Sequence, residues 1–74
     1  MDNGEELKCR VKWFDQKKGF GFAIHPKTQE DIFIHYSAIE GSGYKVLNEN
    51  ELIEVTAVKS QKGLKATSIR KQNK

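Results

Sequence analysis

The feature that most constrains the fold of this chain is a repeated two-residue alternation of apolar and polar side chains. Over residues 7–12, for example, Leu7, Cys9 and Val11 alternate with basic residues. Successive side chains of a β-strand point to opposite faces, so this period predicts strands with one buried and one solvated face. We expect five short strands, over residues 7–12, 20–24, 31–35, 52–58 and 64–69.

Polar turns separate these segments. Gly19 is suited to a positive φ angle at the end of the first turn, and Pro26 cannot donate to a central sheet ladder. A longer connection follows over residues 36–50, in which Ser37 is expected to cap one helical turn. The predicted turns cover residues 15–19, 26–30 and 60–63.

The fold class follows from these elements. Several short strands joined by turns, with no long helical pattern, predict an all-β sandwich or barrel. The chain has 74 residues, and we expect one small domain over residues 1–74 with its core over 7–69. A closed or nearly closed barrel is favoured at this size because closure removes exposed sheet edges.

The aromatic residues of the second and third predicted strands lie where a barrel would expose them. Over residues 31–35, Ile32 and Ile34 share one face, and Phe33 shares the other with His35. If the isoleucines fill the interior, Phe33 faces water, and an exposed phenylalanine forgoes roughly 1.5–3 kcal/mol of burial free energy. A small domain has little stability to spare, so such a surface indicates an interaction site.

The opposite arrangement would place the phenylalanines in the core and turn the isoleucines toward a second layer. Phe20 and Phe22 would then join Phe33 inside, because Gly21 and Ala23 occupy the other face of their strand. We consider this the weaker interpretation. It would bury His35 beside the rings, and the sequence predicts no helix to cover the isoleucine face.

The first strand is expected to add basic side chains to the aromatic surface. Strict alternation would turn Trp13 inward with Val11, whereas a β-bulge near the strand end would turn its ring outward, and alternation alone leaves both open. Cationic side chains among aromatic rings suit single-stranded nucleic acid, because the cations follow the phosphates and each base stacks on a ring. Duplexes are poorer ligands, since their bases already stack on each other. By strict alternation the outward residues of this strand are Lys8, Arg10, Lys12 and Phe14.

Composition narrows the remaining function classes. With 13 Lys and Arg against 10 Asp and Glu, the net charge is +3, which favours an anionic partner without requiring one. Cys9 is the single cysteine of the sequence, so we expect a reduced, half-buried thiol and neither an intrachain disulfide nor a cysteine-built metal site. His25 is expected in a solvated loop, and two histidines at this spacing predict no metal site.

The sequence carries no recognisable catalytic pattern. It lacks a nucleophile–base pairing, a P-loop and a paired carboxylate site, so we expect no enzymatic activity, no cofactor and no small-molecule substrate. Residues 1–6 do not resemble a signal peptide, and no apolar run is long enough for a transmembrane helix. These features predict a cytoplasmic protein that does not bind membranes, and we expect a monomer.

Three ordered motifs resemble those of the cold-shock domain. They are Lys-Trp-Phe over residues 12–14, the RNP1-like Lys-Gly-Phe-Gly-Phe over 18–22, and the RNP2-like Asp-Ile-Phe-Ile-His-Tyr-Ser-Ala-Ile over 31–39. Gly-Tyr-Lys-Val-Leu over 43–47 extends the match, which runs from about residue 7 to 69. The resemblance implies a five-stranded antiparallel OB-fold barrel that binds single-stranded RNA and DNA. Members of this family act as RNA chaperones, and some affect transcription termination and translation.

The resemblance also implies roles for individual residues. Asp31 is similar to a family residue that reaches base edges or fixes the neighbouring loop, and Phe14 to a binding residue partly packed into the sheet. The family places the ring of Trp13 on the binding face. By position, the implied stacking residues are Trp13, Phe20, Phe22, Phe33, His35, Tyr36 and Tyr44, and the implied basic partners are Lys12, Lys18 and Lys62.

Asn50 stands where the family often has glycine, and asparagine tolerates a left-handed backbone better than most residues.

An alternative function for the same aromatic face is the docking of a partner protein, since fold does not determine function. The interleaved lysines argue against that alternative, because protein interfaces are depleted in lysine.

Overall fold

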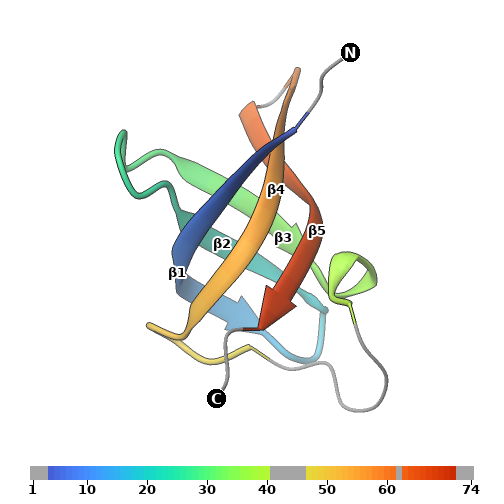
Figure 1. Ribbon diagram of the computed structural model, residues 1–74. Helices are drawn as coiled ribbons and strands as arrows, with labels where there is room; N and C mark the ends of the chain where they lie inside the picture. The colour runs from blue at the N-terminus through green and yellow to red at the C-terminus, as the bar shows by residue number, and fades with distance from the viewer. Residues whose placement is uncertain (1–3, 41–46, 62, 72–74) are drawn as a thin grey trace.

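The computed structural model describes residues 4–40, 47–61 and 63–71. Within these ranges the chain forms a closed barrel of five strands (Figure 1). The prediction of an all-β, five-stranded barrel is therefore confirmed. Its elements are β1 (Glu5–Asp15), β2 (Phe20–Ile24), β3 (Asp31–His35), the 3₁₀ turn η1 (Tyr36–Ala38), β4 (Leu52–Ser60) and β5 (Gly63–Lys71).

The strand order around the barrel is β1-β2-β3-β5-β4. β1 is long enough to pair antiparallel with β4 through its first half and with β2 through its second half. β2 with β3 and β4 with β5 are also antiparallel. The barrel closes between β3 and β5, where a short parallel ladder joins Ile32 to Leu64 and Phe33 to Lys65. In Figure 1, β4 crosses in front of β2 and β3, which form the far wall.

The interior of the barrel is aliphatic. Ile32 and Ile34 are both 0% exposed, as the alternation of their strand predicted. β-branched residues from the other strands meet them, and no polar side-chain atom buried among the described residues lacks a hydrogen-bond partner. Leu47, from the long connection, is only 1% exposed and completes the core at a position for which the sequence indicated no such role.

Two turn residues adopt the left-handed conformation expected of them. Gly19 has φ 79° and Asn50 has φ 66°. The turn at Asn50 is tied to the first strand, because its N–H donates to the carbonyl of Val11 at 2.7 Å and its carbonyl accepts from the guanidinium of Arg10 at 3.0 Å. The connection that precedes β4 is thus anchored to the strand with which β4 pairs.

The expectation for His25 was wrong. Its side chain is buried at 7% exposure rather than solvated. Nδ1 accepts hydrogen bonds from the N–H groups of Lys27 at 3.0 Å and Thr28 at 3.2 Å. The imidazole therefore satisfies two backbone donors of the β2–β3 loop, a local side-chain-to-backbone arrangement of the kind more common for Asn and Asp.

Candidate nucleic-acid interface

A β-bulge near the end of β1 decides which aromatic side chains face solvent. In the pairing with β2, Val11 lies opposite Ala23 but Trp13 lies opposite Phe22, so one extra residue is inserted between them. A single-residue bulge exchanges the two faces of the strand beyond it. Trp13 accordingly faces outward at 36% exposure, and Phe14 packs against the core. The outward direction that strict alternation predicted for Phe14 is wrong, and the choice left open for Trp13 is settled.

Gly21 makes this bulge possible. An ideal Cβ at position 21 would lie 2.1 Å from the carbonyl oxygen of Trp13 and 2.7 Å from the Cα of Phe14. Both atoms belong to the backbone, so no side-chain rotation relieves the contact. The glycine of the RNP1-like motif therefore permits the close approach of two strands and, through it, the outward position of the tryptophan ring.

Cross-strand pairing gathers the exposed rings into one group. Phe20 lies opposite His35 and Phe22 opposite Phe33 in the β2–β3 ladder, and Trp13 lies opposite Phe22 in the β1–β2 ladder. Neighbouring ring centroids lie 5.5–5.9 Å apart within the Trp13, Phe20, Phe22 and Phe33 group, and 6.4 Å apart between Phe33 and His35. We call the following residues the ring cluster: Trp13, Phe20, Phe22, Phe33, His35 and Tyr36.

The rings of this cluster are accessible to a ligand. Phe33 is 36% exposed and Tyr36 is 49% exposed, while Phe20 and Phe22 are half-buried by their neighbours. The isoleucines of β3 are sealed inside. The arrangement with phenylalanines in the core is therefore excluded.

His35 and Tyr36 join the cluster through the turn η1. The expectation that Ser37 caps this turn was wrong, because the cap is His35, whose Nδ1 accepts from the Ser37 N–H at 3.2 Å and lies 2.8 Å from the Ser37 hydroxyl oxygen. The ring of Tyr36 stacks on His35 with centroids 4.6 Å apart, and the Tyr36 N–H donates to the Gly19 carbonyl at 2.8 Å. Since Nδ1 is an acceptor, the neutral imidazole carries its proton on Nε2.

Charged groups border the ring cluster. Lys12 Nζ lies 3.4 Å from Asp31 Oδ1, and both side chains are half exposed. Lys18 is exposed in the β1–β2 turn, where its N–H donates to Asp15 Oδ1 at 3.1 Å. Tyr44 and Lys62, the remaining predicted binding residues, lie outside the described residues.

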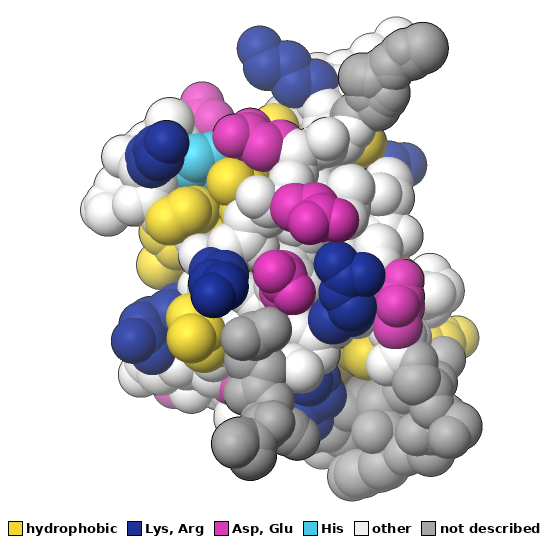
Figure 2. Space-filling view, viewed as in Figure 1, with side chains coloured by type: hydrophobic (Ala, Val, Ile, Leu, Met, Phe, Trp, Pro, Cys, Tyr) yellow, Lys and Arg dark blue, Asp and Glu magenta, His cyan; other side chains and the backbone are white. Residues whose placement is uncertain are grey.

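A different charge pattern covers β1, β4 and β5. On the face seen in Figure 2, acidic and basic side chains are interspersed. Arg70 lies within ion-pair distance of Glu6 (3.5 Å) and Glu54 (3.8 Å). Exposed ion pairs of this kind stabilise a fold little, and their mixed sign gives an anion no continuous positive path.

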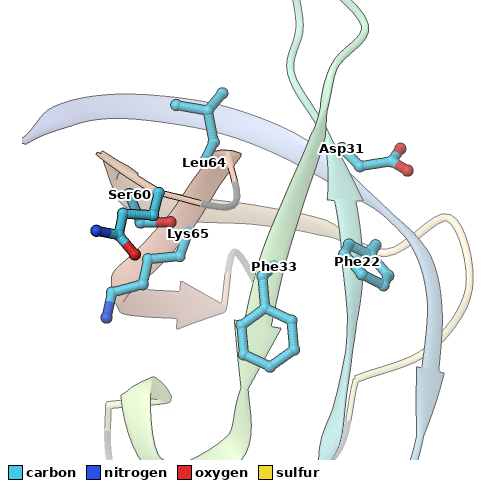
Figure 3. Close-up of a pocket in the computed structure, with 7 residues that line it drawn as sticks. Phe22, Asp31, Phe33, Ser60, Leu64 and Lys65 are labelled. Atoms are coloured by element: carbon cyan, nitrogen blue, oxygen red, sulfur yellow. The ribbon is translucent and has the colours of Figure 1, made fainter.

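A hollow of about 810 Å³ adjoins the ring cluster on the side of β5 (Figure 3). Phe22 and Phe33 form one of its walls, and Lys65 of β5 lies beside Phe33. Lys65 was not among the residues predicted from the sequence to belong to the aromatic surface. The parallel ladder between β3 and β5 brings it next to Phe33. The lining residues are Phe22, Asp31, Phe33, Ser60, Gln61, Leu64 and Lys65.

Cys9, in β1, is a buried free thiol. Burial raises the pKa of the Cys9 thiol from 9.0 to about 11, so the group stays protonated and unreactive at neutral pH. Among residues 4–40, 47–61 and 63–71, no three His, Cys, Asp or Glu side chains are grouped to hold a metal ion. In the same ranges, no helix has the length and apolar character needed to cross a bilayer.

Comparison with known proteins places this geometry in a family. Residues 7–72 match the model of the "'Cold-shock' DNA-binding domain". The chain is 45% identical over 60 residues to "Probable cold shock protein A" of Mycolicibacterium smegmatis, covering 81% of this chain and 90% of that protein. It is 46% identical over 61 residues to "Cold shock-like protein CspLB" of Listeria monocytogenes, covering 82% and 91%. With "Cold shock-like protein CspC" of Escherichia coli K12 it shares 41% identity over 64 residues, covering 86% and 93%.

Proposed function

The chain belongs to the "cold-shock" DNA-binding domain family, and from that premise we propose that it binds single-stranded RNA and DNA by stacking bases on the ring cluster. Proteins of this family bind nucleic acids and are not known as enzymes. The observation that carries the finer proposal is the exposure of aromatic rings from β1, β2 and β3 on one outer face of the barrel.

The energetics of the ring cluster support base stacking. Each base stacked on an aromatic side chain contributes about 1–3 kcal/mol, as measured by alanine substitution. Trp13, Phe33 and Tyr36 are exposed, so several bases of one nucleic-acid strand can each stack on a ring. Edge-to-face contacts between the rings, such as Trp13 with Phe22 at 5.5 Å, hold them in place before the ligand arrives. A preorganised surface loses less side-chain entropy on binding.

Polar groups around the cluster complement the stacking. Lys12 and Lys18 supply positive charge for phosphates. In our proposal, Nε2–H of His35 donates to an acceptor on a base or phosphate, because Nδ1 is already occupied by Ser37. Asp31, beside Lys12, accepts from a base edge.

We extend this binding to an RNA chaperone role in the cytoplasm, with effects on transcription and translation. Stacking does not read hydrogen-bond patterns, so it tolerates many sequences. A protein that holds unpaired bases in this way keeps transcripts from pairing with themselves. We further propose a preference for pyrimidine-rich strands and a monomeric protein.

The test is a titration of Trp13 fluorescence with short pyrimidine-rich RNA and DNA strands. We expect quenching, a micromolar or tighter affinity, and weaker binding as salt rises. Replacing Phe20, Phe22 and Phe33 together with alanine should abolish the quenching, with circular dichroism to verify that the barrel still forms. Single replacement of Phe33 with leucine keeps the test valid if the triple variant does not fold.

Two results would contradict the proposal. One is the absence of quenching and of any mobility shift at low salt. The other is full nucleic-acid affinity in the variants that lack the rings, which would favour a protein partner for this face.

A further inference from the structure

Two hollows share one pair of residues at the parallel seam of the barrel. Phe33 of β3 and Lys65 of β5 are ladder partners, and both side chains are exposed. The hollow of about 810 Å³ reaches from this pair toward Asp31 at the start of β3. A second hollow, of about 420 Å³, reaches from the same pair toward His35 at the end of β3. Phe33 and Lys65 therefore form a ridge between two depressions.

The ridge joins an aromatic ring to a positive charge. In Figure 3, Phe33 and Lys65 extend from neighbouring strands on the same side of the sheet. Asp31, the acidic residue lining the larger hollow, is paired with Lys12, and no ion pair of Lys65 is found among the described residues. The ammonium group thus remains available to an anion from outside.

The outward side chains of β5 continue the surface beyond the ring cluster. Lys65 and Thr67 are exposed, and Ala66 between them points into the barrel. Both exposed residues line the second hollow together with Phe33, His35 and Ser37. Lys65 and Thr67 of β5 are therefore continuous with the aromatic face. They are distant from it in the sequence, since Lys65 follows its ladder partner Phe33 by 32 residues.

Building on the single-strand binding proposed above, we propose that the strand crosses the seam from the ring cluster onto β5 and that Lys65 contacts one of its phosphates there. Lysine offers three donors on a compact charge and no acceptor, which suits a phosphate rather than the mixed edge of a base. A base on Phe33 would place its backbone near the adjacent strand. Lys65 would then act independently of the base stacked beside it.

The salt dependence of binding tests this contact. Each phosphate contact on a single strand contributes about −0.7 to the slope of log affinity against log salt concentration. With an oligothymidylate of about eight nucleotides, within the roughly 4–16 that one OB barrel covers, we expect Lys65→Gln to make the slope shallower by about 0.7. Lys65→Arg should retain the original slope.

Lys8 provides the matched control. The sequence grouped Lys8 with the outward basic side chains of the first strand, but in the structure it is exposed on the half of β1 that pairs with β4, opposite Glu54, whereas the half that pairs with β2 carries Trp13. Lys8→Gln removes the same net charge, so it reports any general effect of charge on the salt slope. We expect its slope to match that of the unmodified protein.

A second measurement identifies the phosphate contacted. Strands with one uncharged methylphosphonate, placed at each linkage in turn, should reveal a linkage whose neutralisation weakens binding to the unmodified protein but not to Lys65→Gln. Equal slopes for Lys65→Gln and Lys8→Gln would overturn the inference, as would a loss that depends on base identity with no change in slope. Absence of binding by the unmodified protein would overturn the proposed function and this inference together, whereas binding with an unchanged Lys65→Gln slope would overturn the inference alone.

Discussion

At the scale of single residues, a glycine controls the direction of a tryptophan. Gly21 lets the backbone of β1 approach within a distance that no Cβ allows, and the bulge formed there turns Trp13 toward solvent. The same displacement sends Phe14 toward the interior, where it packs against the buried core. One small residue thus determines which of two neighbouring aromatic side chains is available to a ligand.

We expect Gly21→Ala to destabilise the barrel by about 3 kcal/mol, the upper part of the range for overpacking, because its methyl group meets backbone atoms. Gly63→Ala is the comparison, because its positive φ of 118° strains an alanine although no atom lies within 4 Å of its Cβ position, so this variant reports backbone strain without a steric contact. Urea unfolding followed by Trp13 fluorescence measures both. A free energy of unfolding for Gly21→Ala equal to that of the unmodified protein would show that the close approach is not decisive.

Cys9 gives the barrel a dependence on alkaline pH. Its pKa is raised to about 11 in the folded protein from an ordinary value of 9.0 because the thiol is buried. Between these values the unfolded chain loses the proton and the folded chain keeps it, so stability falls as pH rises. The loss amounts to about 2–3 kcal/mol by pH 11, because one pKa unit corresponds to about 1.4 kcal/mol.

Chemical unfolding at several pH values between 8 and 11 checks this expectation. Lysines and tyrosines titrate in the same range, so the relevant quantity is the difference between the unmodified protein and Cys9→Ala. That difference should shrink as pH rises. A constant difference would mean that the thiol ionises equally in both states.

At the scale of the element, the two faces of β3 have different environments. Ile32 and Ile34 fill the barrel, and Phe33 and His35 belong to the ring cluster on the outside. The core and the proposed binding surface therefore use alternate residues of the same strand. The strand also connects the two surfaces of the proposed interface, because it pairs with β2 on one side and with β5 on the other.

A pair of conservative substitutions on β3 should separate stability from binding. Ile34→Val removes one methyl group from a fully buried side chain and is expected to cost about 1 kcal/mol of stability with no change in affinity. Phe33→Leu keeps apolar bulk at an exposed site but removes the ring. It should change stability by less than about 1 kcal/mol and weaken single-strand binding by at least about fivefold.

Thermal unfolding and fluorescence titration of the two variants supply the four quantities needed. If Ile34→Val weakened binding as much as Phe33→Leu, the effect would arise from the barrel as a whole. The separation of faces would then not hold.

At the scale of the whole molecule, binding and folding are linked. The ring cluster exists only when β1, β2 and β3 are paired, so the proposed ligand site is absent from the unfolded chain. A ligand that binds only the folded state stabilises it by mass action. A barrel of this size has a modest core, which makes the relative effect large.

We expect an oligothymidylate at about one hundred times its dissociation constant to raise the free energy of unfolding by about 2.7 kcal/mol. In a domain of this length, each kcal/mol corresponds to a shift of about 4–8 °C in the melting temperature. Thermal unfolding followed by circular dichroism measures the shift, with an equal concentration of duplex as the control. Equal stabilisation by duplex and single strand would argue against base stacking as the source of affinity.

The sequence by itself determined the strands, the barrel class and the two faces of β2 and β3. These follow from local rules, because the alternation of side chains along a strand and the hydrophobic demand for an interior are both encoded within a few consecutive residues. The left-handed turns at Gly19 and Asn50 are local in the same sense. The motifs that resemble the cold-shock domain also predicted most residues of the candidate site.

Tertiary structure decided what depends on partners distant in the chain. The direction of Trp13 and Phe14 follows from a bulge that exists only in the pairing of β1 with β2. The burial of His25 is a different case, because the backbone N–H groups that its imidazole accepts from lie only two and three residues further on, in a local turn that side-chain alternation does not reveal. The position of Lys65 beside Phe33 follows from the parallel ladder that closes the barrel. Alternation specifies the face on which a side chain lies, but strand pairing specifies its neighbours, and a binding surface is made of neighbours.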